Sequence, residues 1–204
     1  YVENCTSAAT VKGTNKVGGL IGAKGQSMGP CEIRNCTFTG TVESNVSAGG
    51  ILGNGYDAGS APNSPCVTII DCKVSGTVSG ANYVGGILGA EGVYITQCWG
   101  NGVGRISNNE FTGTIQSSGN YVGGIIGYMC SINKYNLIEN NYYAENCGAE
   151  KGIGFIKYVD TSCEPHETES GAIYFNTANG LPGITGVSTK ELNRTDDPLG
   201  ADKD

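Results

Sequence analysis

Any catalytic or metal chemistry in this sequence would be expected to start from its single histidine. His166 lies three residues after Cys163, and Glu164, Glu167 and Glu169 surround it. A zinc site needs about four ligands, which here would require a second Cys/His pair, and the other cysteines recur inside repeats instead. The segment is therefore interpreted as an acidic loop exposed to solvent. We predict neither a bound metal nor a cofactor.

Other residue types that carry chemistry are also scattered along the chain. Residues 53–57 (GNGYD) loosely resemble one turn of a calcium-binding nonapeptide repeat, but such sites are built between successive repeats and this turn occurs once. Glycosidase chemistry would need paired carboxylates on one face, where this chain places Thr, Ser and Gly. The sequence therefore predicts a protein that is not an enzyme.

The elements that would position such residues form a repeat. A glycine block occurs four times, as VGGLIG at 17–22, AGGILG at 48–53, YVGGILG at 83–89 and YVGGIIG at 121–127. The first glycines of the pairs are 31, 36 and 38 residues apart. Periods of this length are typical of solenoids and propellers. The pairs lack the following helix and the Lys or Ser/Thr of a phosphate-binding loop, so they indicate places where another backbone comes close.

A second block recurs in step with the first. It reads NCTFTGTV at 35–42, DCKVSGTV at 71–78 and NEFTGTI at 109–115, with a looser copy at 4–11. Alternate residues are small or apolar, the period of a half-buried strand. We expect Cys5, Cys36 and Cys72 to form an inward column. Just before this strand, a polar ladder is expected at a turn, formed by Asn4, Asn35, Asp71, Asn108 and Asn140. The alternative interpretation is that Asn is simply common in turns.

Together the two blocks resemble the GLUG motif, which is named for its Gly-Leu-hydrophobic-Gly core. The resemblance covers roughly residues 2 to 175. GLUG repeats recur in bacterial surface proteins, in adhesin-like proteins and in some immunoglobulin A-specific metallopeptidases. The resemblance implies a repeat module attached to further domains of a longer chain. It does not imply peptidase activity, because no HExxH sequence is present.

Composition narrows the classes of protein further. The 204 residues include 34 Gly and only 15% charged residues, with a net charge of −7. Frequent Val, Ile, Thr and Tyr favour short strands and turns. The negative charge and the absence of a basic cluster argue against nucleic-acid binding, and no apolar run reaches the ~20 residues of a membrane span. The sequence begins at Tyr1 without an initiator Met or a signal peptide, so we expect a fragment of a longer protein.

We predict an all-β fold, a β-solenoid of about four to five coils. A right-handed parallel β-helix is favoured because crossovers between parallel strands are almost always right-handed, and a β-propeller is the alternative. The expected solenoid comprises residues 1–175, and residues 176–204 form a C-terminal cap and polar linker, in which residues 188–192 could begin one helical turn. The residues expected to be buried are Phe38, Val42, Val78, Val84, Ile87, Val122 and Ile125.

Nine cysteines are compatible with an oxidising exterior, although an odd number leaves at least one outside any internal pairing. Stacked cysteines in register suit the torsion of a disulfide poorly. Cys31 and Cys66, in equivalent loops ahead of the next strand, are the pair expected to form a disulfide.

For function, we expect an extracellular or cell-surface structural and adhesive module that contacts a host surface or glycan. Segments of variable length follow each glycine block, and their amphipathic aromatic residues suit recognition. The candidate contact residues are Tyr56, Tyr94, Trp99 and Tyr128. For Trp99 and Tyr94, packing against the core is the competing interpretation. The alternative function is a non-catalytic fragment of a carbohydrate-active or peptidase enzyme.

Overall fold

The computed structural model describes most of the first 159 residues and four short strands beyond them. The described residues are 1–24, 31–55, 67–91, 105–131, 137–159, 165–168, 173–174, 187–188 and 191–192. Within them the regular structure consists of strands alone, and there is no helix long and apolar enough to cross a membrane. The all-β prediction is confirmed.

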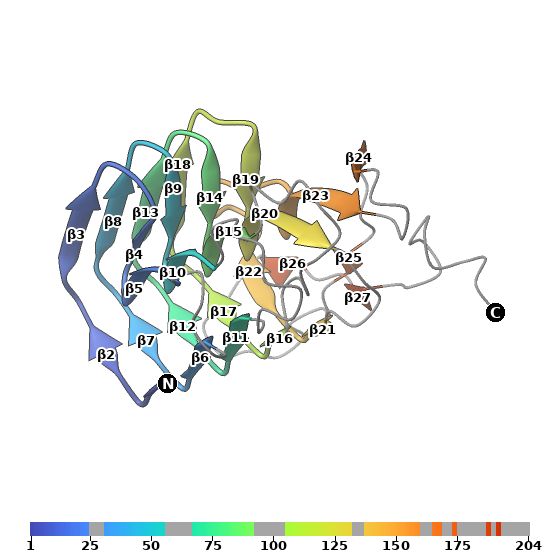
Figure 1. Cartoon of the computed structure of the whole chain (residues 1–204). Coiled ribbons are helices and arrows are strands. Elements are labelled where there is room, and N and C mark those ends of the chain that lie inside the picture. The colour runs from blue at the N-terminus through green and yellow to red at the C-terminus, as the bar shows by residue number, and fades with distance from the viewer. Residues whose placement is uncertain are drawn as a thin grey trace.

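Each of the first four turns of the chain contributes one strand to each of five sheets, here called A to E (Figure 1). Sheet A contains β1 (Val2–Glu3), β6 (Cys31–Arg34), β11 (Val67–Ile70), β16 (Arg105–Ser107) and β21 (Leu137–Glu139). Sheet B contains β2 (Thr6–Ser7), β7 (Thr37–Phe38), β12 (Lys73–Val74), β17 (Glu110–Phe111), β22 (Tyr142–Ala144) and β26 (Val187–Ser188). Sheet C contains β3 (Thr10–Gly13), β8 (Thr41–Ser44), β13 (Thr77–Gly80) and β18 (Thr114–Ser117).

Sheets D and E complete each coil. Sheet D contains β4 (Val17–Gly18), β9 (Ser47–Gly49), β14 (Tyr83–Gly85) and β19 (Tyr121–Gly123). Sheet E contains β5 (Ile21–Ala23), β10 (Leu52–Asn54), β15 (Leu88–Glu91), β20 (Ile126–Ser131), β23 (Ile153–Val159) and β24 (Pro165–Thr168). In four successive repeats the sequence between sheet E and the next strand of sheet A varies in length, and the remaining corners stay short.

Equivalent strands of successive coils pair in parallel and in register. Val42 pairs with Val78, and Val78 pairs with Ile115, so like residues lie above one another. The antiparallel four-stranded blades of a propeller would not pair successive repeats in this way. The fold is a β-solenoid of stacked parallel coils, and the predicted right-handed connection stays a prediction.

The core is filled by side chains that repeat at the same position in each coil. Six of the seven residues predicted to be buried are completely buried: Phe38, Val42, Val78, Val84, Ile87 and Ile125. The prediction for Val122 is wrong, because this side chain packs against the core but is only partly buried. Val122 lies in β19, the edge strand of sheet D, which has no strand of a fifth coil beside it.

The glycine blocks stack as neighbours between sheets D and E. Glycine is required there because neighbouring backbones leave no room for a side chain. A Cβ on Gly85 would lie 2.6 Å from the Gly127 nitrogen and 2.9 Å from the Ile125 oxygen, and it would also strike the Leu88 oxygen. Among the glycines that the structure covers, only Gly148 has a positive φ. The paired glycines are therefore required for the close approach of backbones and not for an unusual backbone conformation.

A polar ladder lies at the corner between sheets A and B, as predicted. Its residues all have left-handed φ angles: 57° for Asn4, 48° for Asn35, 56° for Asp71, 57° for Asn108 and 52° for Asn140. Asn35 Nδ2 donates to Asn4 Oδ1 at 2.6 Å, and Asn108 Nδ2 donates to Asp71 Oδ1 at 3.1 Å. Asn and Asp tolerate this conformation better than other residues, so the corner is stabilised by both its backbone geometry and its side-chain bonds.

The fifth coil follows a shorter path across the end of the core. After β22 the chain turns directly to β23 and omits sheets C and D. The turn is tied to the fourth coil, because Ile115 N donates to Cys147 O at 2.6 Å and Gly124 N donates to Lys151 O at 2.8 Å. Cys147 and Ala149 are buried there. This segment closes one end of the stack, as expected for an atypical terminal repeat.

Antiparallel strands add to this end. β24 pairs with β23, β26 pairs with β22, and β25 (Ile173–Tyr174) pairs with β27 (Glu191–Leu192). The predicted helical turn at residues 188–192 is wrong, because Ser188 pairs with Tyr143 and Leu192 pairs with Ile173. Pairing to neighbouring strands outweighs the local capping signal here. The predicted boundary between residues 175 and 176 lies outside the described residues.

Candidate binding surface

Of the four aromatic residues predicted to contact a ligand, the structure describes only Tyr128. It lies within β20 and is only 5% exposed, so the prediction that it lies in a loop is wrong. Tyr128 is in register with Ala90, which is in register with Asn54, so it takes a position that already lies within sheet E in the second and third coils. Tyr56, Tyr94 and Trp99 lie outside the described residues.

Tyr128 belongs to a cluster of aromatic rings formed by three coils. Tyr83 and Tyr121, paired in register, stack with their ring centroids 5.2 Å apart and an angle of 4° between planes. Tyr128 meets both rings edge-on at 5.5 and 5.6 Å, and Phe155 stacks on it at 5.6 Å. Contacts of this kind contribute about 0.5–1.5 kcal/mol each beyond area burial. Tyr83, Tyr121 and Phe155 are half-buried, so the cluster is partly a packing element and partly surface.

A shallow groove of about 500 Å³ runs along the corner between sheets C and D. Three successive coils line it with Ser44, Asn45, Ser79, Gly80, Ala81, Gln116, Ser117 and Ser118. The lining is uncharged and offers hydroxyl and amide groups that recur from coil to coil. Two of the hydroxyls already accept local bonds, since Val46 N donates to Ser44 Oγ at 3.2 Å and Gly119 N donates to Ser117 Oγ at 3.1 Å. The groove can offer hydrogen bonds to a neutral polar ligand.

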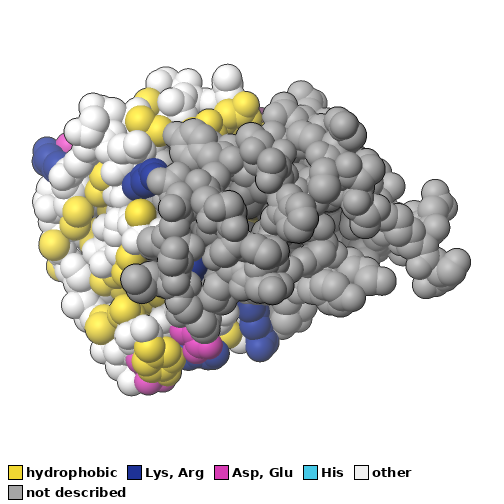
Figure 2. Space-filling model, in the orientation of Figure 1, with side chains coloured by type: hydrophobic (Ala, Val, Ile, Leu, Met, Phe, Trp, Pro, Cys, Tyr) yellow, Lys and Arg dark blue, Asp and Glu magenta, His cyan; other side chains and the backbone are white. Residues whose placement is uncertain are grey.

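Sequence reasoning missed this groove. The only signal was the recurrence of Ser-Asn, Ser-Gly-Ala and Ser-Ser just after the second strand block of three repeats, a composition common to turns in general. On the face shown in Figure 2, the charged side chains of the described residues occur in small separate groups. Two of them join adjacent coils, as ion pairs of 2.8 Å between Lys12 and Glu43 and 3.6 Å between Lys73 and Glu110. Such exposed pairs contribute little to stability.

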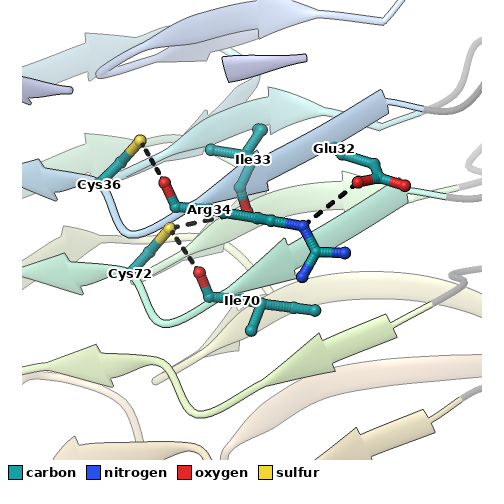
Figure 3. A network of polar contacts seen from close by, with 6 residues as sticks. All are labelled: Glu32, Ile33, Arg34, Cys36, Ile70 and Cys72. Atoms are coloured by element: carbon teal, nitrogen blue, oxygen red, sulfur yellow. Dashed lines mark hydrogen bonds and ion pairs between the residues drawn. The ribbon is translucent and has the colours of Figure 1, made fainter. Parts of the chain in front are cut away.

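The inward cysteine column is confirmed for Cys36 and Cys72, which are completely buried. Cys5 takes the same position but is exposed, because no described coil lies on its outer side. Each buried thiol donates to a carbonyl two residues earlier, Cys36 to Arg34 O at 3.0 Å and Cys72 to Ile70 O at 3.3 Å (Figure 3). These hydrogen bonds hold the two thiols inside the core, where they pack as small apolar side chains.

Burial keeps these thiols protonated. Desolvation raises the pKa of Cys36, and it raises the pKa of Cys72 from 9.0 to about 12. Since the thiolate is the reactive form, neither sulfur is suited to nucleophilic chemistry near neutral pH. Cys31 begins β6 and pairs with Val67, the residue after Cys66. Cys66 lies outside the described residues, so the Cys31–Cys66 disulfide stays a prediction.

We expect the protonated thiols to make the protein less stable at alkaline pH. Above pH 9 the unfolded chain releases thiol protons that the folded chain keeps up to a pH of about 12 at Cys72, so the folded state binds more protons and the free energy of unfolding falls as pH rises. The slope from one such group is at most about 1.4 kcal/mol per pH unit. Urea unfolding with a reductant at pH 8, 9 and 10 should show a steeper decline for the natural chain than for Cys72→Ala. Equal slopes would contradict this expectation.

The chain is thus a repetitive parallel β-solenoid, and within the described residues no group of three or more His, Cys, Asp or Glu side chains could hold a metal ion. A family model described as "The GLUG motif" matches residues 13–43. The match runs from the end of β3 through the first glycine block to β8, so the resemblance to GLUG repeats is confirmed there. No curated protein and no solved structure gives a significant match. Residues 13–43 carry a GLUG motif.

Proposed function

We propose that this chain is a non-catalytic structural and adhesive module of a bacterial surface or secreted protein, whose outer surface contacts glycan or host. The observation that carries the proposal is the in-register stack of five coils, in which buried polar groups bond to one another. Asn109 Nδ2, for example, donates to Asn141 Oδ1 at 2.9 Å and to Ile69 O at 2.8 Å. A frame of this kind holds its corners at fixed spacing.

Two regions supply the contact surface in this proposal. The groove between sheets C and D offers Asn45, Gln116 and serine hydroxyls, which suit the hydroxyl groups of a sugar. The connections between sheets E and A carry Tyr56, Tyr94 and Trp99, and rings of this type can pack on a sugar ring. A secreted or surface location agrees with the low charge and with the GLUG resemblance.

A glycan and mucin array tests the adhesive part of the proposal. The purified chain should bind at least one arrayed glycan or mucin, and either the Tyr94→Ala/Trp99→Ala variant or the Asn45→Ala/Gln116→Ala variant should lose that binding. The melting temperature is the control for each pair. Asn45 and Gln116 are exposed, and exposed side chains contribute little to stability, so the melting temperature of that variant should stay nearly unchanged. The proposal expects the same of the Tyr94→Ala/Trp99→Ala variant. Failure to bind any glycan or mucin would refute adhesion, and a large drop in melting temperature would identify the substituted residues as core residues.

Two further measurements test the non-catalytic assignment and the proposed location. Incubation of the purified chain with each bound glycan should leave the glycan intact, and its hydrolysis would refute the non-catalytic assignment. Protease treatment of intact cells of the source organism should release peptides of this chain, if it is displayed outside. Peptides recovered only after lysis would refute the location.

A further inference from the structure

The strands of the first coil are the edge strands of all five sheets. β1, β2, β3 and β4 each stand at the end of their sheet's strand order, as does β5 in sheet E, and no described strand pairs with their outer sides. Such an edge presents unpaired N–H and C=O groups, which another chain can use as a template. The opposite end of the stack is closed by the short fifth coil. The residues on the outer side of the first coil show whether a further coil could pair with it.

A glycine position between sheets B and C shows what stacking requires. Gly40, Gly76 and Gly113 occupy this position in the second, third and fourth coils, and a Cβ on each would strike the carbonyl oxygen of the coil before it. The oxygens concerned belong to Ala9, Gly40 and Gly76.

These oxygens are not free to move, because each accepts a ladder bond. Thr41 N donates to Ala9 O at 3.1 Å, and Thr77 N donates to Gly40 O at 3.0 Å. A coil that has another coil in register before it therefore needs glycine here. The first coil has Ala9.

The position of Ser7 also indicates that the first coil is not suited to follow another coil. In the later coils a bulky side chain lies beneath the second glycine of the preceding coil: a Cβ on Gly19 would lie 2.6 Å from the ring of Phe38, and one on Gly50 would lie 2.7 Å from Val74. Phe111 and Tyr143 fill the same place beneath Gly86 and Gly124. The first coil has Ser7, which pairs in register with Phe38 and lacks the bulk to fill the space beneath a glycine pair.

Gly22 does not argue against this pattern. It occupies the position of Gly53, which faces the preceding coil, but a Cβ on Gly22 would already lie 2.9 Å from Lys16 O of its own coil. Glycine is therefore needed at residue 22 whether or not another coil precedes it. The positions of Ser7 and Ala9 are therefore the ones that distinguish a coil with another coil before it from a coil without one.

We propose that Ala9 and Ser7 make the N-terminal face of the first coil reject a further GLUG-type coil in register, whichever chain offers it. The Ala9 methyl group would meet the carbonyl oxygen of the incoming coil at the point where Thr10 N–H must bond to it. Ser7 would leave a void beneath the incoming glycine pair. Both residues therefore prevent this face from acting as a template for an in-register coil.

Grafting an extra coil onto this face tests the proposal. A copy of residues 31–67 placed ahead of Tyr1 puts the copied strands in step with the first coil, because Val2 pairs with Ile33 and Ile33 with Ile69. Amide hydrogen exchange should find the copy unprotected in the chain with Ser7 and Ala9. In the Ser7→Phe/Ala9→Gly background its ladder amides should exchange at least about tenfold more slowly.

The same copy also serves as its own control at an internal site. Residues 31–66 repeated between Cys66 and Val67 should be protected, because a glycine then stands at every stacking position. Equal protection of the N-terminal copy in both backgrounds would overturn the proposal. So would an N-terminal copy that stays unprotected in both backgrounds while the internal copy is protected, since the substituted face should then have accepted it.

Discussion

Replacing Gly85 by alanine should destabilise the protein by about 3 kcal/mol or more, a large loss for a single added methyl group. The new Cβ would meet the Leu88 oxygen, the Gly127 nitrogen and the Ile125 oxygen. All three are backbone atoms in strands or at their ends, so no side-chain rotation can relieve the contact. Two adjacent coils would have to separate locally, and the ladder bonds between them would weaken.

A loss of stability is the opposite of what a glycine-to-alanine substitution usually causes. Where a glycine is replaced by alanine without strain, the protein commonly gains about 0.4–1 kcal/mol through the unfolded state. Gly13→Ala is the matched control, because its Cβ would meet a single side-chain atom, Val17 Cγ2 at 2.8 Å. Urea unfolding of both variants measures the difference. A Gly85→Ala variant as stable as Gly13→Ala would show that the sheets are less closely packed than described.

Asn109→Ala should be the second severe change, with an expected loss of about 2–4 kcal/mol, because buried polar groups would each lose a hydrogen bond and a cavity would form. The Asn109 side chain is completely buried and accepts from Cys72 N at 2.9 Å. It also donates to Ile69 O at 2.8 Å and to Asn141 Oδ1 at 2.9 Å. Alanine would remove all three bonds and leave a cavity in the fourth coil.

Cysteine provides the control at this position. Cys36 and Cys72 occupy it in the second and third coils, and Cys5 N donates to Cys36 Sγ at 3.5 Å. Asn109→Cys should therefore retain part of the column and lose less stability than Asn109→Ala. Thermal unfolding of the two variants decides the matter, and equal losses would mean that the hydrogen bonds of the column contribute little.

The repeat phase was sufficient to predict the stacking, because each residue type recurs at a fixed distance from the glycine pair. Cys36 above Cys72 and the turn at Asn35 followed from that phase. Val122 was mispredicted because sequence alone does not show that the fifth coil omits sheet D. The turn at residues 188–192 was mispredicted because a local capping signal says nothing about a distant partner such as Tyr143.

The candidate surfaces were harder to predict than the core. Tyr128 follows a glycine block in the same phase as Ala90, and nothing local indicates that sheet E extends past it and covers it with Phe155. The groove is made of serine and small residues from three coils, and it exists only because the coils stack. Features that recur at the same position in every coil could be predicted, whereas those that depend on turns shared by several coils or on an omitted strand could not.

In-register pairing also makes the length of this molecule a discrete variable. Thr68 pairs with Arg105, so removing residues 68–104 would join two points that lie one above the other and would leave every ladder continuous. The same holds for the addition of a whole repeat between two internal coils. The module can therefore lengthen or shorten in steps of about 4.8 Å without any change in cross-section, so the distance that it spans is set by the number of repeats and not by their individual sequences.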